Sequence, residues 1–388
     1  MPEQGLRPVA APPGGAFRPR ADAALALADG RVFRGLGFGA DAAAEGEAVF
    51  TTTMTGYQEV CTDPSFRGQI VCMTFPLIGN YGVNDDDDES RQPWIAGLVV
   101  RELDGAPSNW RSTGDLDGYL RRAGIPGIAG VDTRALTRHI RQVGDTRATL
   151  VRDAAGLDDE DLVARAGAAG LPGERDVVGE VAGAEPETAG PMDGPHVVVV
   201  DCGVKRNIVR SLLARGARVT TVPYGTPYGA IAALAPDGII VSPGPGDPAL
   251  LDDGLDVVRA TLASGTPYFG ICLGHQLLAR AIGAETGKLK FGHRGGNHPV
   301  LDRRTGRVTI TAQNHGYRVE PDSLPLGGPW ETVLVNLNDG SVEGLAHREL
   351  PVASVQFHPE ASPGPMDANG MFDGFLRQVA ARRAGVGG

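Results

Sequence analysis

Cysteine is scarce in this sequence. Of 388 residues only four are cysteine, and no two of them form a CxxC pair: Cys61, Cys72, Cys202 and Cys272. Their number and spacing exclude a disulfide scaffold and a thiolate zinc site. Unpaired cysteines are also what we expect of a protein in the reducing cytoplasm.

Long apolar runs and an excess of positive charge are absent as well. No stretch approaches the length that a membrane helix needs, and the first residues lack the apolar segment of a signal peptide. The 36 Lys and Arg residues are outnumbered by 47 Asp and Glu residues, which gives a formal charge of −11. We therefore expect no binding to nucleic acid or to a membrane, and a cytoplasmic location.

Motifs for phosphoryl transfer and for metal binding are also missing. The chain has neither a P-loop nor an HxxxH pair. The acidic run Asp85–Asp88 is interpreted as a solvated loop, because no ligand spacing around it supports a cation site. We expect no metal and no cofactor in this chain.

The length allows two domains, and composition divides the chain into four parts. Residues 1–20, rich in Pro, Gly and Arg, predict a disordered tail. Residues 21–152 carry mixed strand and helix signals and predict an α/β domain. Residues 153–194 read as an Ala/Gly- and acid-rich linker with a short helix over 158–166. Residues 195–386 alternate apolar strands with helices, which predicts a doubly wound, mostly parallel, flavodoxin-like sheet.

The first domain shows no catalytic group of its own. Its patterns predict strands at Gln69–Phe75 and Trp94–Arg101, and a strand entering a polar loop at Phe50–Glu59. Asp132–Val143 has helical spacing with Asp132 as its N-cap, and His139 on that helix is expected to be packed or exposed. We therefore expect this domain to bind or dock.

The second domain begins with the apolar strand Val197–Asp201. Further strands are predicted at Arg218–Val222, Gly238–Ser242 and Tyr268–Ile271, with a helix over Asn207–Arg215. Ligands of such sheets bind beyond the carboxyl ends of the strands. The loops after the first, third and fourth of these strands are therefore the candidate site.

The segment PYFGICLGHQLLARAIG, residues 267–283, predicts a strand, a tight turn and a helix around Cys272. This is the layout of a nucleophile elbow with sulfur in place of the usual hydroxyl. A helix N-terminus favours a thiolate, and the amide of Leu273 is free to bind an oxyanion. Most cysteines are instead small buried hydrophobes, but the two flanking glycines favour the interpretation of Cys272 as a nucleophile.

The loop SPGPGDP, residues 242–248, follows the third strand. It lacks the Lys and Ser/Thr of a phosphate-binding loop, and a rigid turn without a ligand role is a strong alternative. Beside a nucleophile, the amide of Gly244 becomes a candidate oxyanion donor.

His358 and Glu360 are the candidate partners of Cys272. They follow the predicted strand Val352–Phe357, and residues two apart in extended chain project to the same face. His358 could exchange a proton with the thiol while Glu360 fixes its tautomer. His315 is the nearest competitor but has no carboxylate beside it, and FGHRGGNHP, with two further histidines, is predicted to be a loop.

At this point the motifs resemble a known family. FGICLGHQLL, SPGPGDP, QNHGY and VQFHPE are similar to a class I (triad) glutamine amidotransferase domain. TMTGYQEVCTDPSF, FPLIGNYG and IPGIAGVDTRALTRHIR resemble the small, glutamine-hydrolysing subunit of carbamoyl-phosphate synthetase, as does FGHRGGNHPV. The resemblance covers about residues 22–150 and 195–385.

The resemblance implies a role for each matching residue. Cys272 would attack the side-chain amide of L-glutamine and form a thioester, with His358 as base and then acid and Glu360 orienting it. The glutamine and oxyanion site would comprise Ser65, Gly244, Gly246, Leu273, Gln276, Asn314, Gly316 and Tyr317. Two positions depart from the usual pattern, Pro243 for Asn and Tyr317 for Phe, and both affect only local pocket shape.

A partner chain is implied as well. Ammonia would pass through an interior tunnel to a large subunit, which uses ATP, Mg²⁺ and bicarbonate to make carbamoyl phosphate for arginine and pyrimidine synthesis. A heterodimer, or a higher oligomer of heterodimers, is expected. Two alternatives stay open: an amidotransferase serving another synthetase, and an inactive scaffold subunit.

Overall fold

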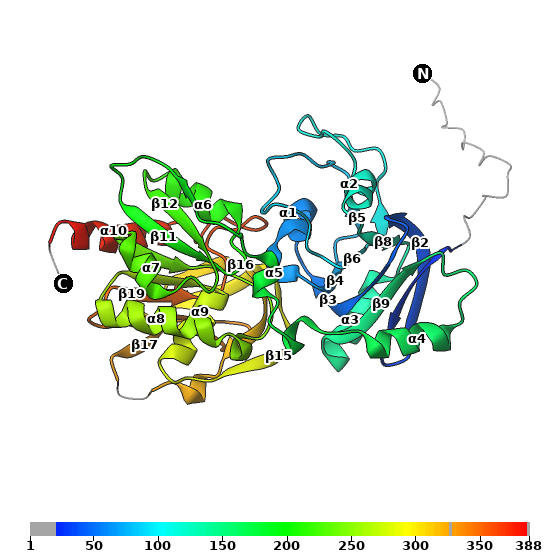
Figure 1. The fold of residues 1–388 in the computed structure, drawn as a ribbon. Helices are drawn as coiled ribbons and strands as arrows, with labels where there is room; N and C mark the ends of the chain where they lie inside the picture. Colours follow the sequence, from blue (N-terminus) through cyan, green and yellow to red (C-terminus); the bar gives the residue numbers. More distant parts are fainter. Residues whose placement is uncertain (1–20, 326–327, 386–388) are drawn as a thin grey trace, which may run out of the picture.

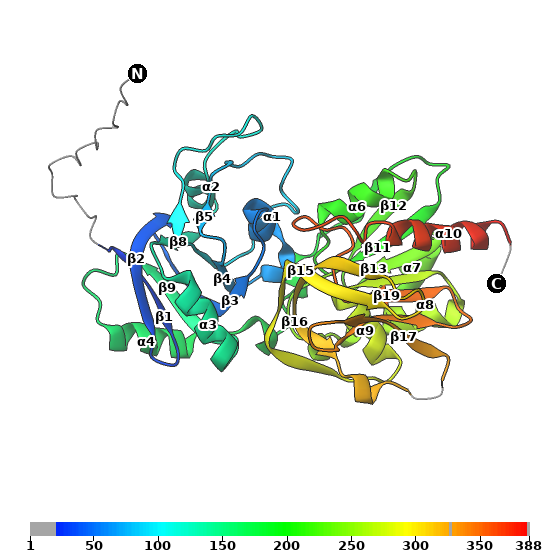
Figure 2. The ribbon, with the colours of Figure 1, turned by 180° about the vertical axis from the view of Figure 1, so that it is seen from behind.

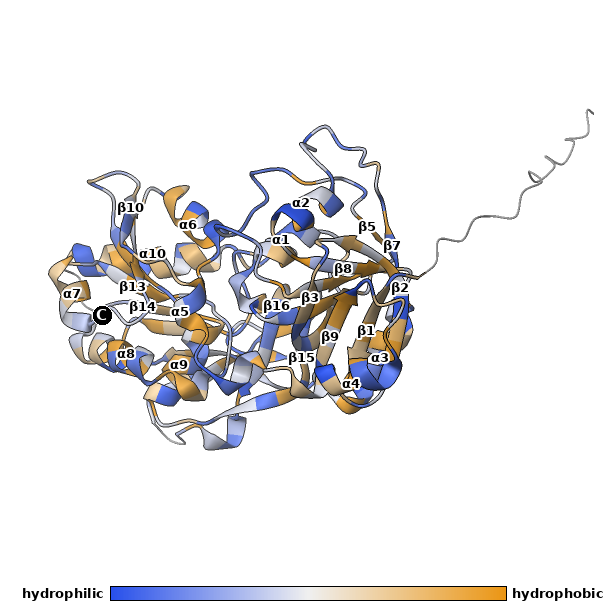
Figure 3. Ribbon diagram, turned by 45° about the vertical axis from the view of Figure 1, so that its right-hand side comes forward, coloured by the Kyte–Doolittle hydropathy of each residue, from blue (hydrophilic) through white to orange (hydrophobic). Residues whose placement is uncertain are grey.

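Residues 21–325 and 328–385 are described by the structure, a computed structural model, in which two domains lie side by side (Figure 1). The predicted tail at residues 1–20 lies outside the described part, as does residue 386. Hydrophobic residues concentrate on the strands of both domains, and the loops above the first domain are mostly polar (Figure 3).

The first domain is built around a closed seven-stranded barrel, a more specific architecture than the α/β domain predicted. Its strands run in the order β1-β2-β8-β6-β4-β3-β9. Their bounds are β1 (Ala23–Leu27), β2 (Val32–Gly39), β3 (Ala43–Thr51), β4 (Gln69–Met73), β6 (Gly97–Val99), β8 (Pro126–Ala129) and β9 (Thr146–Arg152). The short strands β5 (Leu77–Ile78) and β7 (Glu102–Leu103) pair separately.

Three helices accompany the barrel: α1 (Tyr57–Thr62), α2 (Leu116–Arg122) and α3 (Thr133–Val143). α3 begins where predicted, because Asp132 Oδ1 accepts a hydrogen bond from the amide of Ala135 at 2.9 Å. Leu136 and Ile140, one helical turn apart, are fully buried in the same core as the barrel strands. His139 is packed, as expected, and its ring contacts Asp29.

Two predictions for this domain differ in part from the structure. The predicted change from strand to loop within Phe50–Glu59 occurs where β3 ends at Thr51, but Tyr57–Glu59 belong to α1 and not to the loop. Gln58 is buried and bonds the backbone of Asn84 through both ends of its amide, at 2.5 and 3.0 Å. Tertiary contacts of this kind override local strand propensity. Trp94–Arg101 contributes only Gly97–Val99 to the barrel.

The second domain is a ten-stranded sheet in the order β10-β12-β11-β13-β14-β19-β18-β17-β15-β16. The central strands are β12 (Arg218–Pro223), β11 (His196–Asp201), β13 (Gly238–Val241), β14 (Tyr268–Ile271) and β19 (Val352–Val355). These five are mutually parallel, as predicted. The remaining strands are antiparallel: β10 (Glu187–Ala189), β18 (Val342–His347), β17 (Trp330–Asn336), β15 (Thr286–Asp302) and β16 (Val308–Val319).

One loop prediction was wrong here. FGHRGGNHP lies inside β15, where His293 pairs with His315 of β16. The pairing register shifts on both sides of the Gly-rich stretch, between Lys288 and His293 and between Gly295 and His298. Glycines therefore mark bulges in a strand at this position, and the sequence signal for a bulge resembles that for a loop.

Helices cover both faces of the parallel strands (Figures 1 and 2). α7 (Tyr228–Ala233), α8 (Asp252–Ser264) and α9 (Leu273–Ala281) share one apolar core. α6 (Arg206–Leu213) and α10 (Met371–Arg383) share the core on the opposite face. The doubly wound prediction is therefore confirmed for the parallel part. No helix of the described chain is long and apolar enough to span a membrane.

The segment 153–194 has more structure than a simple linker. It forms α4 (Asp159–Ala168), α5 (Val178–Val181) and the edge strand β10. Leu162 and Ala166 of α4 are buried against the barrel strand β1. β10 pairs antiparallel with β12, so the segment is attached to both domains.

A buried ion pair joins the two domains. Arg294 of β15 donates to Asp145, just before β9, at 3.1 Å, and the two side chains are 2% and 0% exposed. The backbone of β15 also bonds to the first domain, since Thr52 N donates to Arg294 O at 3.1 Å. Removal of one partner alone would leave a buried charge uncompensated.

We predict that Asp145→Ala lowers the free energy of unfolding by about 3–5 kcal/mol, because it leaves the buried Arg294 charge without its partner. The double variant Asp145→Ala with Arg294→Met should recover a large part of that loss. Urea unfolding of the three proteins measures both values. A single-variant cost below about 1 kcal/mol, as for an exposed pair, would contradict the assignment.

Candidate active site

Cys272 occupies a strained turn between β14 and α9. Its backbone angles are φ 52° and ψ −100°, a region that non-glycine residues rarely adopt. The flanking glycines permit this turn because neighbouring backbone carbonyls lie where a side chain on either glycine would stand. A Cβ on Gly270 would lie 2.5 Å from the carbonyl oxygen of Gly274, and one on Gly274 would lie 2.2 Å from that of Val241. The predicted elbow geometry is therefore confirmed.

The thiol of Cys272 is buried and surrounded by polar groups. Its Sγ lies 3.7 Å from the carbonyl oxygen of Asn314 and accepts from Gln356 Nε2 at 3.7 Å. Leu273 starts α9, so its amide is one of the N–H groups that a helix leaves without an intrahelical acceptor. The side chain of Leu273 packs into the core, which leaves only that amide for a role in the site.

His358 and Glu360 form a buried pair beside the thiol. His358 Nδ1 lies 2.6 Å from Glu360 Oε1, and the side chains are 2% and 0% exposed. Burial by itself would lower the pKa of His358, but the negative charge of Glu360, the Cys272 thiol and the hydrogen bond to Glu360 together outweigh burial and raise it. The amide of Cys272 donates to the carbonyl of Val355, three residues before His358, at 2.8 Å, and Nε2 of His358 makes no hydrogen bond within the described residues.

Lys205 extends this pair, and sequence reasoning missed it. Its Nζ lies 3.2 Å from Glu360 Oε1 and also donates to the carbonyl of Ala361. Burial would raise the pKa of Glu360, but the charges of Lys205 and then His358 outweigh burial and lower it. Lys205 stands directly before α6 and is 2% exposed. A lysine in the loop after the first parallel strand, at the ligand-binding edge of the sheet, was the available signal.

Cys272 lies in the wall of a pocket that both domains form. Seven other predicted site residues share this wall: Ser65, Gly244, Gly246, Gln276, Asn314, Gly316 and Tyr317. Eight wall residues were not foreseen: Glu47, Gln69, Pro172, Gly173, Pro245, Lys288, Arg294 and His315. His358 lies behind the wall, in an adjoining cavity that Lys205 and Asn314 also line.

The first domain orients two of these groups through Asp63. Its carboxylate accepts from the amide of Ser65 at 2.9 Å and from Asn314 Nδ2, in the second domain, at 2.8 Å. The buried hydroxyl of Ser65 has no hydrogen-bond partner among the residues that the structure describes. A buried hydroxyl in a pocket wall is therefore available to a substrate.

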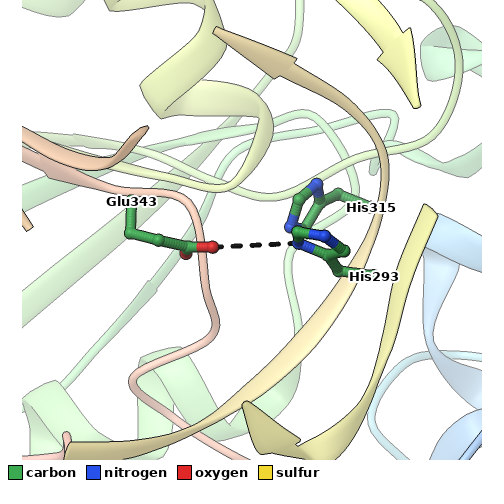
Figure 4. A group of neighbouring side chains, drawn as sticks. All are labelled: His293, His315 and Glu343. Atoms are coloured by element: carbon green, nitrogen blue, oxygen red, sulfur yellow. Dashed lines mark ion pairs between the residues drawn. The ribbon is translucent and has the colours of Figure 1, made fainter. Parts of the chain in front are cut away.

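His293, His315 and Glu343 form the one group among the described residues whose spacing could hold a metal ion (Figure 4). Their ligand atoms lie within 4.8 Å of one another, and His293 Nδ1 is 3.8 Å from Glu343 Oε1. Hydrogen bonds already occupy Glu343 and His315. Glu343 accepts from Gln313 and Asn336, and both ring nitrogens of His315 face acceptors. We therefore interpret the group as a buried polar network behind β16.

Comparisons with known proteins add two kinds of match. The family described as "Glutamine amidotransferase class-I" matches residues 198–378, and "Carbamoyl-phosphate synthase small chain, CPSase domain" matches residues 25–150. The carbamoyl phosphate synthase small chain of Listeria monocytogenes serotype 4b is 50% identical over 361 residues, covering 93% of this chain and 98% of that protein.

Two further relatives agree. The carbamoyl phosphate synthase small chain of Symbiobacterium thermophilum is 51% identical over 359 residues, with 91% of this chain and 97% of that protein covered. The pyrimidine-specific small chain of Halalkalibacterium halodurans is 49% identical over 363 residues, with 92% and 97% covered.

The network behind β16 predicts a pH effect on stability. Burial raises the pKa of Glu343 from 4.5 to about 7, so the folded protein holds a proton there that the unfolded chain has lost. Stability should therefore fall as pH rises from 4.5 to 7, by about 1–3 kcal/mol more than in Glu343→Gln. Urea unfolding at pH 4.5, 6 and 8 measures this difference.

Glu349→Gln, at an exposed position nearby, is the matched control and should keep the wild-type slope. An unchanged pH dependence in Glu343→Gln would show that this carboxyl does not carry the effect.

Proposed function

The chain belongs to the carbamoyl-phosphate synthase small-chain family, and we propose that Cys272, His358 and Glu360 form the triad by which it hydrolyses L-glutamine to glutamate and ammonia. The observation that carries the proposal is the strained Cys272, at the carboxyl end of the central strand β14, beside a buried His358–Glu360 pair. A nucleophile, a base and a group that orients the base are then in place.

The reaction begins with attack of the Cys272 thiolate on the carboxamide carbon of glutamine, which forms a C–S bond. The amides of Leu273 and Gly244 hold the oxyanion of the tetrahedral intermediate. His358, protonated at Nε2, gives that proton to the departing nitrogen, so the C–N bond breaks and ammonia leaves. A γ-glutamyl thioester remains on Cys272.

Water completes the cycle. His358, now neutral, takes a proton from a water molecule, whose oxygen attacks the thioester carbon. The C–S bond then breaks, glutamate leaves, and the thiolate and imidazolium are restored. Glu360 holds Nδ1–H of His358 throughout, which keeps Nε2 directed to the reacting atoms.

Ser65, Gly246, Gln276, Asn314, Gly316 and Tyr317 are proposed to bind the substrate. Ser65 comes from the first domain, so the pocket is complete only when both domains are present. This accounts for a first domain that carries no nucleophile of its own.

The ammonia is proposed to pass to a separate large subunit in the cytoplasm. That subunit would use ATP, Mg²⁺ and bicarbonate to make carbamoyl phosphate, because this chain has no P-loop of its own. A heterodimer is the smallest assembly that this division of chemistry requires. The product would serve arginine and pyrimidine synthesis.

Cys272→Ala should separate the two nitrogen sources. Glutamine hydrolysis should fall at least about 1000-fold, because the bond-forming atom is lost. Carbamoyl phosphate synthesis from added ammonia, measured in the complex with the large subunit, should stay at the wild-type rate. Retained hydrolysis in this variant would overturn the triad. A wild-type chain that hydrolyses glutamine but does not serve this large subunit would overturn the proposed partner.

Replacement of the two partners of Cys272 should have unequal effects. His358→Asn removes the group that moves protons and should lower glutamine hydrolysis about 1000-fold. Glu360→Gln should lower it less, about 10- to 100-fold, because an amide oxygen can keep the contacts to Lys205 and His358 Nδ1 but no longer supplies the negative charge that raises the pKa of His358.

Steady-state hydrolysis measures both variants, with urea unfolding as the control for stability. Losses of equal size would contradict the assigned division of roles, in which His358 moves the protons and Glu360 orients His358.

A further inference from the structure

Residues 169–182, here called the strap, cross from α4 to the second domain and form part of the substrate pocket. Pro172 and Gly173 of the strap line the same wall as Ser65 and Cys272. The sequence alone predicts only an acid-rich linker here and assigns it no function. A substrate bound in this pocket would therefore meet the strap as well as the wall that contains Cys272.

The strap touches both domains at very short range. A Cβ built on Gly173 would lie 2.3 Å from the hydroxyl oxygen of Tyr317, in the second domain. The ring of Pro172 lies 3.1 Å from the corresponding position on Gly68, in the first domain. A side chain at position 173 would therefore collide with the Tyr317 hydroxyl, since the backbone of the strap packs directly against the Tyr317 side chain.

Ion pairs hold the strap in this position. Glu174 accepts from the amide of Leu171 at 3.0 Å and pairs with Arg147 of β9, which also donates to the carbonyl of Ala169. These contacts fix the short turn Pro172–Glu174 that carries the pocket residues.

The other end of the strap is held by further arginines of the first domain. Glu180 lies 2.7 Å from Arg67, and Arg91 donates to the carbonyls of Val181 and Glu180 at 2.7 and 2.8 Å. Ion pairs and hydrogen bonds therefore attach the strap to the first domain, while Val178 buries its side chain in the core of the second domain, which carries the nucleophile.

We propose that the strap is a specificity-determining element that limits the pocket to free glutamine and excludes glutamine extended by a peptide bond. The inference rests on the proposed function. Because the carboxamide must reach Cys272, the amino-acid end of the substrate lies between the remaining walls, and the strap is one of them. A wall of backbone and proline ring has few rotamers with which to make room for an added residue.

Gly173→Ala tests the close contact. The added methyl group forces the Tyr317 hydroxyl to move, and a misfit of one methyl group in a pocket changes kcat/KM by about 10-fold or more. We expect this loss to appear mainly as a higher KM for glutamine. Gly170→Ala is the matched control, because a Cβ at that strap position meets no atom within 4 Å.

Glu174→Gln tests the selectivity itself. Loss of the pair with Arg147, an exposed ion pair, should loosen the strap and raise hydrolysis of L-glutaminylglycine relative to L-glutamine about twofold to fivefold. Glu160→Gln, an exposed change on α4, is the control and should leave that ratio unchanged.

All five proteins are assayed in complex with the large subunit, with ammonia-dependent synthesis as the measure of intact assembly. A KM of Gly173→Ala equal to that of Gly170→Ala, or an unchanged dipeptide ratio in Glu174→Gln, overturns the role of the strap. Failure of the proposed function is distinct, because the wild-type chain itself would then not hydrolyse glutamine.

Discussion

The strained backbone of Cys272 is the constraint on which the rest of the structure depends. A non-glycine residue in this region costs about 1–3 kcal/mol, and such a conformation persists only where its surroundings over-determine it. Here β14 is held between two parallel neighbours, β13 and β19, and its flanking glycines pack against backbone carbonyls. The result is a thiol fixed at the start of a helix, next to the Leu273 amide that the helix leaves without an intrahelical acceptor.

A line of buried charge continues from this thiol into the protein. His358, Glu360 and Lys205 alternate in sign, and each is almost completely buried. Buried charges are tolerated only when they are paired. After the charge of Glu360, the charges of Asp63 and Glu89, both in the first domain, also raise the pKa of Lys205, so the first domain helps to balance these buried charges. Both domains therefore contribute charges to this buried group, just as both contribute residues to the pocket.

The sequence predicted the parts of the site that depend on local pattern. Short-range signals predicted the elbow around Cys272 and the pair His358 and Glu360, which are two residues apart after a strand. The motifs that contain these residues also led to the family assignment. Lys205 was missed because its role comes from residues more than 150 positions away, and no periodicity reports such a pairing. The role of the strap was missed for the same reason, because it depends on the contact of Gly173 with Tyr317, which lies far away in the sequence.

Fold prediction failed where tertiary contacts outweigh local preference. The glycines of FGHRGGNHP suggested a loop but lie at bulges in β15, and the edge strand β10 has too short a pattern to stand out. The parallel strands, with their continuous apolar runs, were predicted within a few residues because burial on both faces leaves a strong signal.

The central claim is that the side-chain amide of glutamine is hydrolysed through a covalent thioester on Cys272. The most direct measurement is an acid quench during turnover of radiolabelled L-glutamine, followed by mapping of the labelled peptide. The account predicts label on the peptide that contains Cys272, in a form that hydroxylamine releases, and none in Cys272→Ser that behaves in this way. Turnover of glutamine without labelled Cys272 peptide, or with label at another residue, would contradict it.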